Sequence, residues 1–436
     1  MTVHSRSNSY RPVPTPAQLR WQDYEIGLLY HFDLSTYRDD GSDHAVRRAP
    51  VDPARFTPVS LDTDQWLEAA VAAGAKYAMF TASHETGFAN WQSDLYQYGV
   101  KHVAWGNGKR DIVGEFVASC RKYGIAPGLF IGLRFNLYKN VSSYLVQNGS
   151  ADEQKAYIEV CERQVEELCS RYGALDEIWI EGGALAPDEG GPDILPIVER
   201  HQPDTVFYHS PQRGDHRWVG NEKGVAGYPC WATMPHRGGR TVHGTQEYAS
   251  LLANGDPDAL YWSPAMCDVP IRDHRWFWHP GEDHLVYGLD DLVEMYDKSV
   301  GRNGVLTIGA VPDRNGLIPE ADFARYAEFG REIHRRFSTP IAAGSGSGST
   351  VELVLPEPAR IDQIVIQEDI ALGERIRAYR VEGKTGTEWE TLCEGVSIAH
   401  KRIQRFDATE VAAIRLACME YVAEPRIRNL AVYHIG

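Results

Sequence analysis

EIWIEGG, residues 177–183, places a charged residue at the end of a short apolar run. Ile178, Trp179 and Ile180 form a run that is typical of a strand buried on both faces of a parallel sheet. Glu181 follows directly, and the two glycines after it allow a ligand to approach the backbone closely. The stretch predicts either a functional carboxylate at the carboxyl end of a strand or a glutamate bonded to a polar residue of a neighbouring strand.

Similar apolar runs occur on both sides of this stretch, between residues 26 and 337, and amphipathic helical patterns separate them. The predicted strands are Gly27–Leu34, Lys76–Ser83, Pro127–Leu133, Glu177–Gly183, Thr205–Ser210, Tyr261–Cys267 and Gly304–Val311, with a poorer pattern at Val219–Ala226. The predicted helices include Asp62–Ala73, Asp111–Tyr123 and residues 152–172. Seven or eight alternating units predict an α/β fold with a TIM-like (β/α)8 barrel.

The pattern changes after residue 341. Residues 342–350, AAGSGSGST, are rich in glycine and serine and predict a flexible joint. Short alternating strands follow at Val351–Leu355, Gln363–Gln367, Arg377–Gly383 and Val411–Ala417. These predict a C-terminal antiparallel β-sandwich. The domains are then a catalytic barrel over 1–340 and a sandwich over 350–436. The sandwich could bind carbohydrate, but a short joint favours packing against the barrel as support.

The chain is acidic. Its 44 Lys and Arg residues oppose 60 Asp and Glu residues, which gives a formal net charge of −16. Such a surface repels phosphate backbones and anionic lipids, which disfavours nucleic acid and membrane partners and favours a glycan or small glycoside. The 11 Trp, 22 Tyr and 13 Phe residues fit sugar stacking, although large cores also consume aromatic residues.

The cysteines and the N-terminal residues indicate where in the cell the protein is expected to be located. The 7 cysteines are odd in number and include no Cys-x-x-Cys pair, which argues against a disulfide framework or structural zinc. Met1–Arg20 lacks the apolar core of a secretory signal, and no apolar run approaches the ~20 residues of a membrane span. We therefore expect a cytoplasmic protein. No metal-ligand spacing or nucleotide motif occurs, so neither a metal nor a cofactor is predicted. The oligomeric state stays open.

A second carboxylate, Glu222, lies within HRWVGNEKG, residues 216–224. Glycosidases use two carboxyls, about 5–5.5 Å apart when the reaction retains the anomeric configuration and about 6.5–9.5 Å apart when it inverts. Glu181 and Glu222 could provide such a pair from two strand ends. The alternative for Glu222 is a loop ion pair, for example with Arg217.

Histidines lie at the ends of the first two strands. His31 is followed by Asp33, and His84 by Glu85, with Trp91 soon after. Histidines at adjacent strand ends could bond sugar hydroxyls. Each could equally be a satisfied core residue.

At these residues the chain resembles the family 29 glycoside hydrolases, the α-L-fucosidases, particularly the subgroup that cleaves α-1,3/1,4-linked fucose. The likeness covers nearly the whole sequence. The segments that carry it include Trp21–Phe32 (WQDYEIGLLYHF), Thr81–Trp91, Glu177–Gly183, Arg217–Gly224 (RWVGNEKG), Tyr261–Phe277, Ser299–Asn303 (SVGRN) and residues 366–376. So much ordered agreement is more specific than any single motif.

The resemblance implies an exo-acting, retaining enzyme that requires no metal. It would release a terminal α-L-fucosyl or closely related sugar through a glycosyl-enzyme intermediate. By position, Glu181 is implied as the nucleophile and Glu222 as the acid/base. The substrate-binding residues we expect are His31, His84, Glu85, Trp91, Trp179, Arg217, Asn221, Met266 and Trp276.

The chain departs from the family pattern around this predicted pocket. Glu181 stands where the family has Asp, Glu85 where it has His, Met266 where it has Glu, and Asp33 where it has Gly. The added methylene of Glu181 moves its carboxylate by roughly an ångström, and such a displacement can cost ~10²-fold in rate. Because the scaffold motifs are kept, we interpret the changes as altered sugar recognition.

Two alternatives follow. One is an exo-glycosidase for a different glycone, in which Glu85 and Asp33 would recognise extra hydroxyls or a cationic group. The other is a weakly catalytic glycan-binding protein, although a pure lectin would need neither Glu181 nor Glu222.

Overall fold

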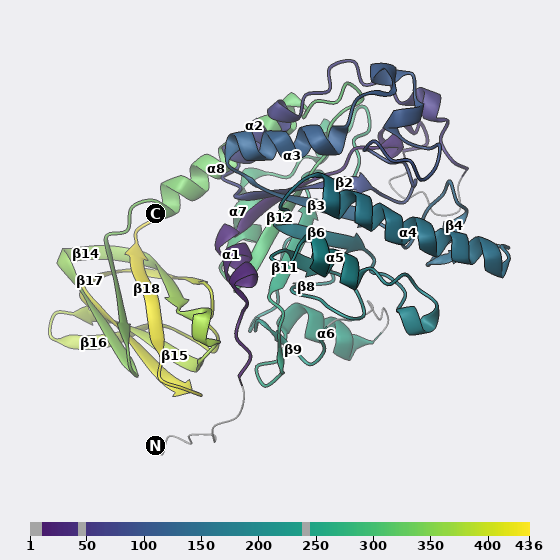
Figure 1. The fold of residues 1–436 in the computed structure, drawn as a ribbon. Helices are drawn as coiled ribbons and strands as arrows, with labels where there is room; N and C mark the ends of the chain where they lie inside the picture. The colour runs from purple at the N-terminus through teal and green to yellow at the C-terminus, as the bar shows by residue number, and fades with distance from the viewer. Residues whose placement is uncertain (1–10, 42–48, 238–244) are drawn as a thin grey trace.

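The computed structural model describes residues 11–41, 49–237 and 245–436. Figure 1 shows a barrel of parallel strands surrounded by helices, and beside it an antiparallel β domain formed by the C-terminal part of the chain. This confirms the predicted (β/α)8 barrel followed by a β-sandwich. No helix within the described ranges combines the length and apolar character needed to cross a membrane.

Eight parallel strands form the barrel, in the sheet order β7-β6-β3-β2-β1-β12-β11-β8. Their bounds are β1 Ile26–Tyr30, β2 Tyr77–Ser83, β3 Ala126–Gly132, β6 Glu177–Glu181, β7 Val206–Tyr208, β8 Arg217–Trp218, β11 Ala265–Pro270 and β12 Gly304–Ala310. They follow chain order around the barrel, and β12 pairs with β1. Most of their residues are buried, which explains the continuous apolar runs in the sequence.

Helices surround the barrel strands. They are α1 Pro16–Tyr24, α2 Thr63–Ala72, α3 Ile112–Tyr123, α4 Ala151–Arg171, α5 Leu195–His201, α6 Gln246–Asn254, α7 Leu289–Ser299 and α8 Glu320–Phe337. Local sequence sets their ends: the Asp111 side chain accepts from the Gly114 N–H at the start of α3, and Gly124, at φ 68°, ends it. Two short hairpins are β4 Val141–Ser142 with β5 Leu145–Val146, and β9 Thr233–Met234 with β10 Tyr261–Trp262.

Two strand predictions are wrong in their bounds. The run Tyr261–Cys267 divides into β10, which pairs outside the barrel, and β11, which starts at Ala265 and continues to Pro270. The weak strand at Val219–Ala226 is a loop, and the barrel strand at this point is β8, just before it. β8 pairs in parallel with β11, with Arg217 opposite Ala265 and Trp218 opposite Met266. The Arg217 N–H donates to the Pro264 carbonyl just before β11.

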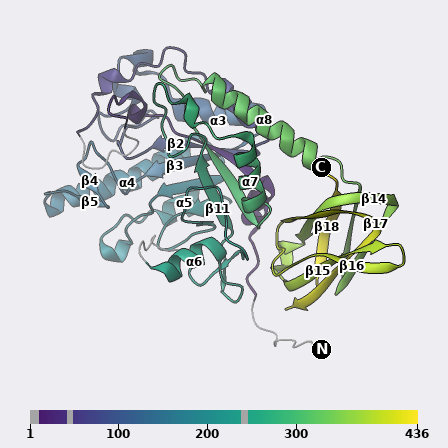
Figure 2. The same cartoon turned by 180° about the vertical axis from the view of Figure 1, so that it is seen from behind.

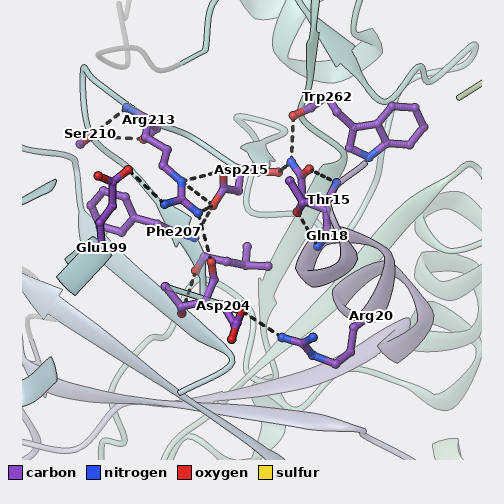
Figure 3. A network of polar contacts seen from close by, with 12 residues as sticks. Thr15, Gln18, Arg20, Glu199, Asp204, Phe207, Ser210, Arg213, Asp215 and Trp262 are labelled. Carbon is purple, nitrogen blue, oxygen red and sulfur yellow. Dashed lines mark hydrogen bonds and ion pairs between the residues drawn. The ribbon is translucent and has the colours of Figure 1, made fainter. Parts of the chain in front are cut away.

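The ends of the sheet order, β7 and β8, are joined by a polar network, which Figure 3 shows. The Asp215 carboxylate accepts from the Phe207 N–H at 2.8 Å, and the Asp215 N–H donates to the Phe207 carbonyl at 2.9 Å. Arg213 forms an ion pair with Asp215 at 2.7 Å. From α1, the Gln18 amide donates to the carbonyls of Asp215 and Trp262. One backbone hydrogen bond and several side-chain hydrogen bonds thus join β7 and α1 to the segment before β8.

Asp215→Ala should lower the free energy of unfolding by about 1–3 kcal/mol, because it leaves the Phe207 N–H without its acceptor and removes the ion pair between Asp215 and Arg213. Urea denaturation followed by circular dichroism measures this. Asp188→Ala is the matched control, since Asp188 is exposed, and it should change stability by less than about 0.5 kcal/mol. Equal effects of both changes would contradict a closing role for Asp215.

The C-terminal domain is a single antiparallel six-stranded sheet folded into a sandwich, with the order β13-β18-β14-β17-β15-β16. Its strands are β13 Ala342–Ser347, β14 Thr350–Glu368, β15 Ile376–Thr385, β16 Glu388–Gly395, β17 Arg402–Tyr421 and β18 Arg426–Tyr433. The prediction of a flexible joint at 342–350 is wrong, because this segment forms β13 and the start of β14. Small residues do not prevent their backbone from pairing with β18.

The sandwich packs against the barrel. Lys401 forms an ion pair with Glu25 at 2.5 Å, and the Asn303 side chain donates to Glu374 at 2.8 Å. Ile403 and Tyr433 belong to the same apolar cluster as the barrel helices. Figure 2 shows α8 leading from the barrel directly to the sandwich. The contacts agree with a supporting role for the sandwich.

Candidate active site

A cavity of about 200 Å³ lies at the carboxyl ends of the barrel strands. It is smaller than the roughly 300–1,000 Å³ of most ligand pockets, which suits a single sugar ring. Its lining residues are Leu29, His31, His84, Glu85, Phe130, Arg134, Trp179, Glu181, Gly182, Tyr208, His209, Trp218, Glu222, Asp268 and Trp276. The structure thereby brings together seven residues that the sequence predicts for the site: His31, His84, Glu85, Trp179, Glu181, Glu222 and Trp276.

Glu181 is the last residue of β6, and its half-buried side chain lines the cavity. The residue after it, Gly182, has φ 58°, and a Cβ there would lie 2.5 Å from the Arg134 Cδ atom. Glycine therefore lets the chain turn away from β6 and leaves room for the Arg134 side chain, which also lines the cavity.

Glu222 lies in the loop after β8 and is exposed at the cavity. Its backbone is left-handed, with φ 48°. The indole N–H of Trp276 donates to its carboxylate at 3.1 Å. Asn221 stabilises the turn, since its side-chain oxygen accepts from the Lys223 N–H and its amide donates to the Val225 carbonyl. Asn221 thus acts on the loop rather than on the cavity wall.

Aromatic rings form one wall of the cavity. The His31 and His84 rings meet edge to face, with centroids 5.4 Å apart, and His84 stacks on Phe130 at 5.6 Å. Trp276 lies 5.0 Å from His31, and Trp179 packs edge-on against Phe130. Packed rings of this kind offer flat faces to sugar C–H groups and fix the directions of the histidine nitrogens.

Asp268, on β11, is a lining carboxyl that the sequence analysis did not select. Burial and the nearby charge of Glu222 raise the pKa of Asp268 to about 8, against the hydrogen bond from the Trp218 indole, which lowers it. That bond is 2.7 Å long. Asp268 follows the predicted strand Tyr261–Cys267 directly, so the strand-end signal used for Glu181 could have found it.

Other lining residues that sequence reasoning missed also follow strands. Arg134 comes shortly after β3, Tyr208 and His209 lie at the end of β7, and Trp218 ends β8. Arg134 brings a guanidinium into a cavity that otherwise carries several carboxyls. Within the described ranges, no group of three or more His, Cys, Asp and Glu side chains is placed to hold a metal ion.

Trp91 and Arg217 do not reach the cavity. Trp91 is fully buried, and its indole N–H donates to Glu167 of α4 at 2.8 Å, so the ring packs behind the barrel wall. The Arg217 guanidinium donates to the carbonyls of Leu252 and Ser263, which are buried groups on the outer side of β8. The structure therefore does not bring Trp91 and Arg217 together with the predicted site residues that line the cavity.

Met266 and Asp33 are also buried, and neither lines the cavity. Met266 is 1% exposed and packs in the apolar cluster that fills the barrel interior. The Asp33 carboxylate accepts from the Ser35 N–H at 2.6 Å and from the Thr86 hydroxyl at 2.5 Å. Asp33 therefore holds the loop after β1. It does not line the cavity, where the alternative of an exo-glycosidase for a different glycone would need it to meet the sugar.

A (β/α)8 barrel whose strand ends bring carboxyls, histidines and tryptophans into one small cavity has the architecture of a glycoside hydrolase. The family model of alpha-L-fucosidases matches residues 16–335. The chain belongs to the α-L-fucosidase family, which is glycoside hydrolase family 29, and it is a fucosidase-like glycoside hydrolase.

Individual relatives agree over nearly the full length. A candidate α-L-fucosidase 1 from Oryza sativa is 33% identical over 97% of this chain and 85% of its own length. A candidate α-L-fucosidase from Bacteroides thetaiotaomicron, known from a crystal structure, is 44% identical in sequence to this chain. Its structure superposes with a TM-score of 0.93 over 98% of this chain and 100% of that one. A glycoside hydrolase 29 family member from an unknown rumen bacterium is 29% identical, with a TM-score of 0.83, over 98% of this chain and 78% of that one.

Proposed function

We propose that the protein releases a terminal α-L-fucosyl residue from a glycan with retention of configuration, Glu181 acting as nucleophile and Glu222 as acid/base. The observation that carries this proposal is that both carboxyls line one cavity sized for a single sugar, at the carboxyl end of the barrel. The family relationship supports the fucosyl glycone, and the motif at Arg217–Gly224 supports the subgroup that cleaves α-1,3/1,4 linkages.

The reaction has two steps. In the first, the Glu181 carboxylate attacks the anomeric carbon while Glu222 donates a proton to the departing glycosidic oxygen, which leaves a glycosyl ester on Glu181. In the second, Glu222 takes a proton from a water molecule, and the oxygen of that water attacks the anomeric carbon and releases Glu181. Trp276 orients the Glu222 carboxylate through its indole N–H.

The sugar would be bound mainly by the ring wall and the neighbouring polar groups. His31 and His84 can bond hydroxyls, and the faces of Trp179 and Trp276 can cover C–H groups. Glu85, also in the lining, adds a hydrogen-bond acceptor that a neutral hydroxyl or a cationic group could meet.

Glu85 also supports a second candidate function, the hydrolysis of a related L-sugar that carries one more hydroxyl. The residue is 5% exposed, and it lines the cavity where the resemblance implies a histidine. An additional hydroxyl on the sugar could donate a hydrogen bond to this carboxyl.

Initial rates with p-nitrophenyl α-L-fucoside and α-L-galactoside separate these functions, because the galactoside differs by one C6 hydroxyl. We expect kcat/KM to favour the fucoside by about tenfold or more, since a poorly matched hydroxyl costs roughly 1–3 kcal/mol. Proton NMR of the first product should show the α-anomer. A preference for the galactoside would establish the second candidate, and binding of fucose without turnover of either substrate would indicate a glycan-binding protein.

A cytoplasmic location stays a prediction from Met1–Arg20, of which residues 1–10 lie outside the described ranges.

A further inference from the structure

A second, smaller cavity adjoins the sugar-sized cavity on the side of β7 and β8, and we call it the β8 recess. Tyr208, His209 and Trp218 line both spaces, so the two meet at these side chains. Residues of β8 and α6 form the sides of the recess (Figure 1). Its volume is about 40 Å³, against about 200 Å³ for the sugar-sized cavity. The recess therefore has room for a small polar group but not for a second sugar ring.

The β8 recess lies on the side from which the acid/base residue of the proposed function comes. Trp218, which lines the recess, ends β8, and Glu222 belongs to the loop that follows this strand. The acid/base carboxyl of a retaining glycosidase protonates the leaving oxygen, so the leaving group lies beside it. A substituent on the leaving group is thus closer to the recess than a substituent on the far side of the fucosyl ring.

The two adjoining spaces carry opposite charge. The described residues that line the β8 recess include no Asp or Glu, although the whole chain has a net charge of −16. They include two arginines and three histidines, which are Arg217, Arg237, His209, His216 and His236. The sugar-sized cavity has four carboxyls and one arginine in its lining. An anion is therefore disfavoured in the sugar-sized cavity and favoured in the recess.

Arg237 supplies the exposed positive charge of the recess. It follows β9, which pairs with β10, and its carbonyl accepts from the Gly214 N–H in the connection between β7 and β8. These bonds place the Arg237 backbone beside the recess. The side chain is exposed, and no ion pair joins it to a carboxylate of the described residues. The acidic residue of the β7–β8 connection, Asp215, is already paired with Arg213.

Buried polar groups form the deeper wall. The Arg217 guanidinium is 2% exposed and donates to two backbone carbonyls and to the Cys230 sulfur, and it has no ion pair with a carboxylate of the described residues. His216 bonds the Glu177 carboxylate through Nε2, whereas its buried Nδ1 has no hydrogen-bond partner in the described part of the chain. Because Glu177 offsets His216, the permanent positive charge of the recess comes from Arg217 and Arg237.

We propose that the β8 recess binds an anionic substituent of the leaving group, a sulfate or a carboxylate on the sugar to which the fucosyl residue is attached, and that Arg237 selects for it. A guanidinium suits both anions, because its planar set of N–H donors matches their paired oxygens. The inference rests on the proposed function, which places the leaving group beside Glu222. It adds a substrate class to that function, namely acidic rather than neutral fucosylated glycans.

Three disaccharides with the same leaving hydroxyl test the proposal. They are α-L-fucosyl-(1→4)-N-acetylglucosamine, its 6-O-sulfate, and the analogue in which C6 is a carboxylate. At low ionic strength, kcat/KM should favour at least one anionic disaccharide over the neutral one by about tenfold or more, the scale of a hydrogen bond to a charged group. The favoured disaccharide shows whether the recess takes sulfate or carboxylate. About 0.5 M NaCl should reduce the preference, because salt screens an exposed charge.

Arg237→Gln removes the charge but keeps a polar side chain, and it should bring the ratio of anionic to neutral kcat/KM close to one. Arg237→Glu should reverse the ratio, because like charges repel. The matched control is Arg331→Gln, at an exposed position of α8, which should keep the wild-type preference. A wild-type enzyme without preference for either anion would overturn the proposal, and so would a preference that survives Arg237→Gln.

The proposed function can fail separately. If the wild-type protein hydrolyses none of the three disaccharides, the fucosidase assignment is at fault, and binding still tests the recess. Calorimetry should then show that N-acetylglucosamine 6-sulfate or the corresponding uronic acid binds wild type more tightly than N-acetylglucosamine does, and that Arg237→Gln loses the difference. Equal binding of all three sugars to the wild-type protein would overturn the anion site.

Discussion

Glu181→Gln should lower kcat/KM for an α-L-fucoside on the order of 10⁴-fold or more, the scale of loss seen when a hydrolase loses its nucleophile. Glutamine keeps the size of the side chain at the end of β6 but cannot form the glycosyl ester. Binding of fucose, measured by calorimetry, should persist. Added azide should restore turnover and give the β-L-fucosyl azide, because the small anion attacks from the face that Glu181 occupies.

The matched control for this change is Glu247→Gln, at an exposed position of α6, which should keep full activity. Glu181→Asp shortens the side chain to the residue usual in the family and should lower fucoside turnover by up to ~10²-fold, since the cavity holds a carboxylate placed about an ångström further out. If Glu181→Gln retained most of its activity, Glu181 would not be the nucleophile. If Glu181→Asp were faster than wild type, fucose would not be the sugar for which this cavity is built.

Glu222→Gln should lower kcat/KM for methyl α-L-fucoside by about 10²–10⁴-fold, the usual contribution of general acid–base catalysis. With α-L-fucosyl fluoride, the rate of the first step should fall less than with methyl α-L-fucoside, because fluoride leaves with little protonation. Azide should rescue the second step and yield the α-L-fucosyl azide, since it then replaces water on the face opposite the ester with Glu181.

This product is the opposite anomer to the one expected from Glu181→Gln, so the pair of azide experiments assigns the two carboxyls independently. Stopped-flow and steady-state rates with both substrates give the comparison. A Glu222→Gln enzyme that loses activity equally on both substrates, without azide rescue, would assign Glu222 to binding rather than to proton transfer.

The sequence predicted the part of the site that depends on strand ends. Glu181, His84 and Glu85 were found because a buried parallel strand appears as an uninterrupted apolar run, and the residue that ends the run must lie at the barrel edge. Asp268 directly follows the predicted run Tyr261–Cys267 and was not selected, although the same signal points to it; in the structure it lies within β11, which continues to Pro270.

Side-chain direction could not be predicted in this way. Trp91 and Asp33 lie in the segments that follow β2 and β1, but long-range partners in α4 and in the loop after β2 turn them into the scaffold. Residues 342–350 were misassigned because a Gly/Ser composition describes backbone freedom, whereas the pairing of β13 depends on β18, some eighty residues further along the chain.

The position of β13 has a consequence for the two domains. Only residues 338–341 separate α8 from the first strand of the sandwich, and the Ile341 N–H already donates to the Val432 carbonyl of β18. So short a connector leaves no hinge, and the ion pairs and apolar contacts between the domains oppose rotation. The sandwich is therefore not an exchangeable module. Any graft or truncation that cuts at residue 350 would remove the edge strand β13, and β18 would keep β14 as its only neighbour and become an edge strand itself.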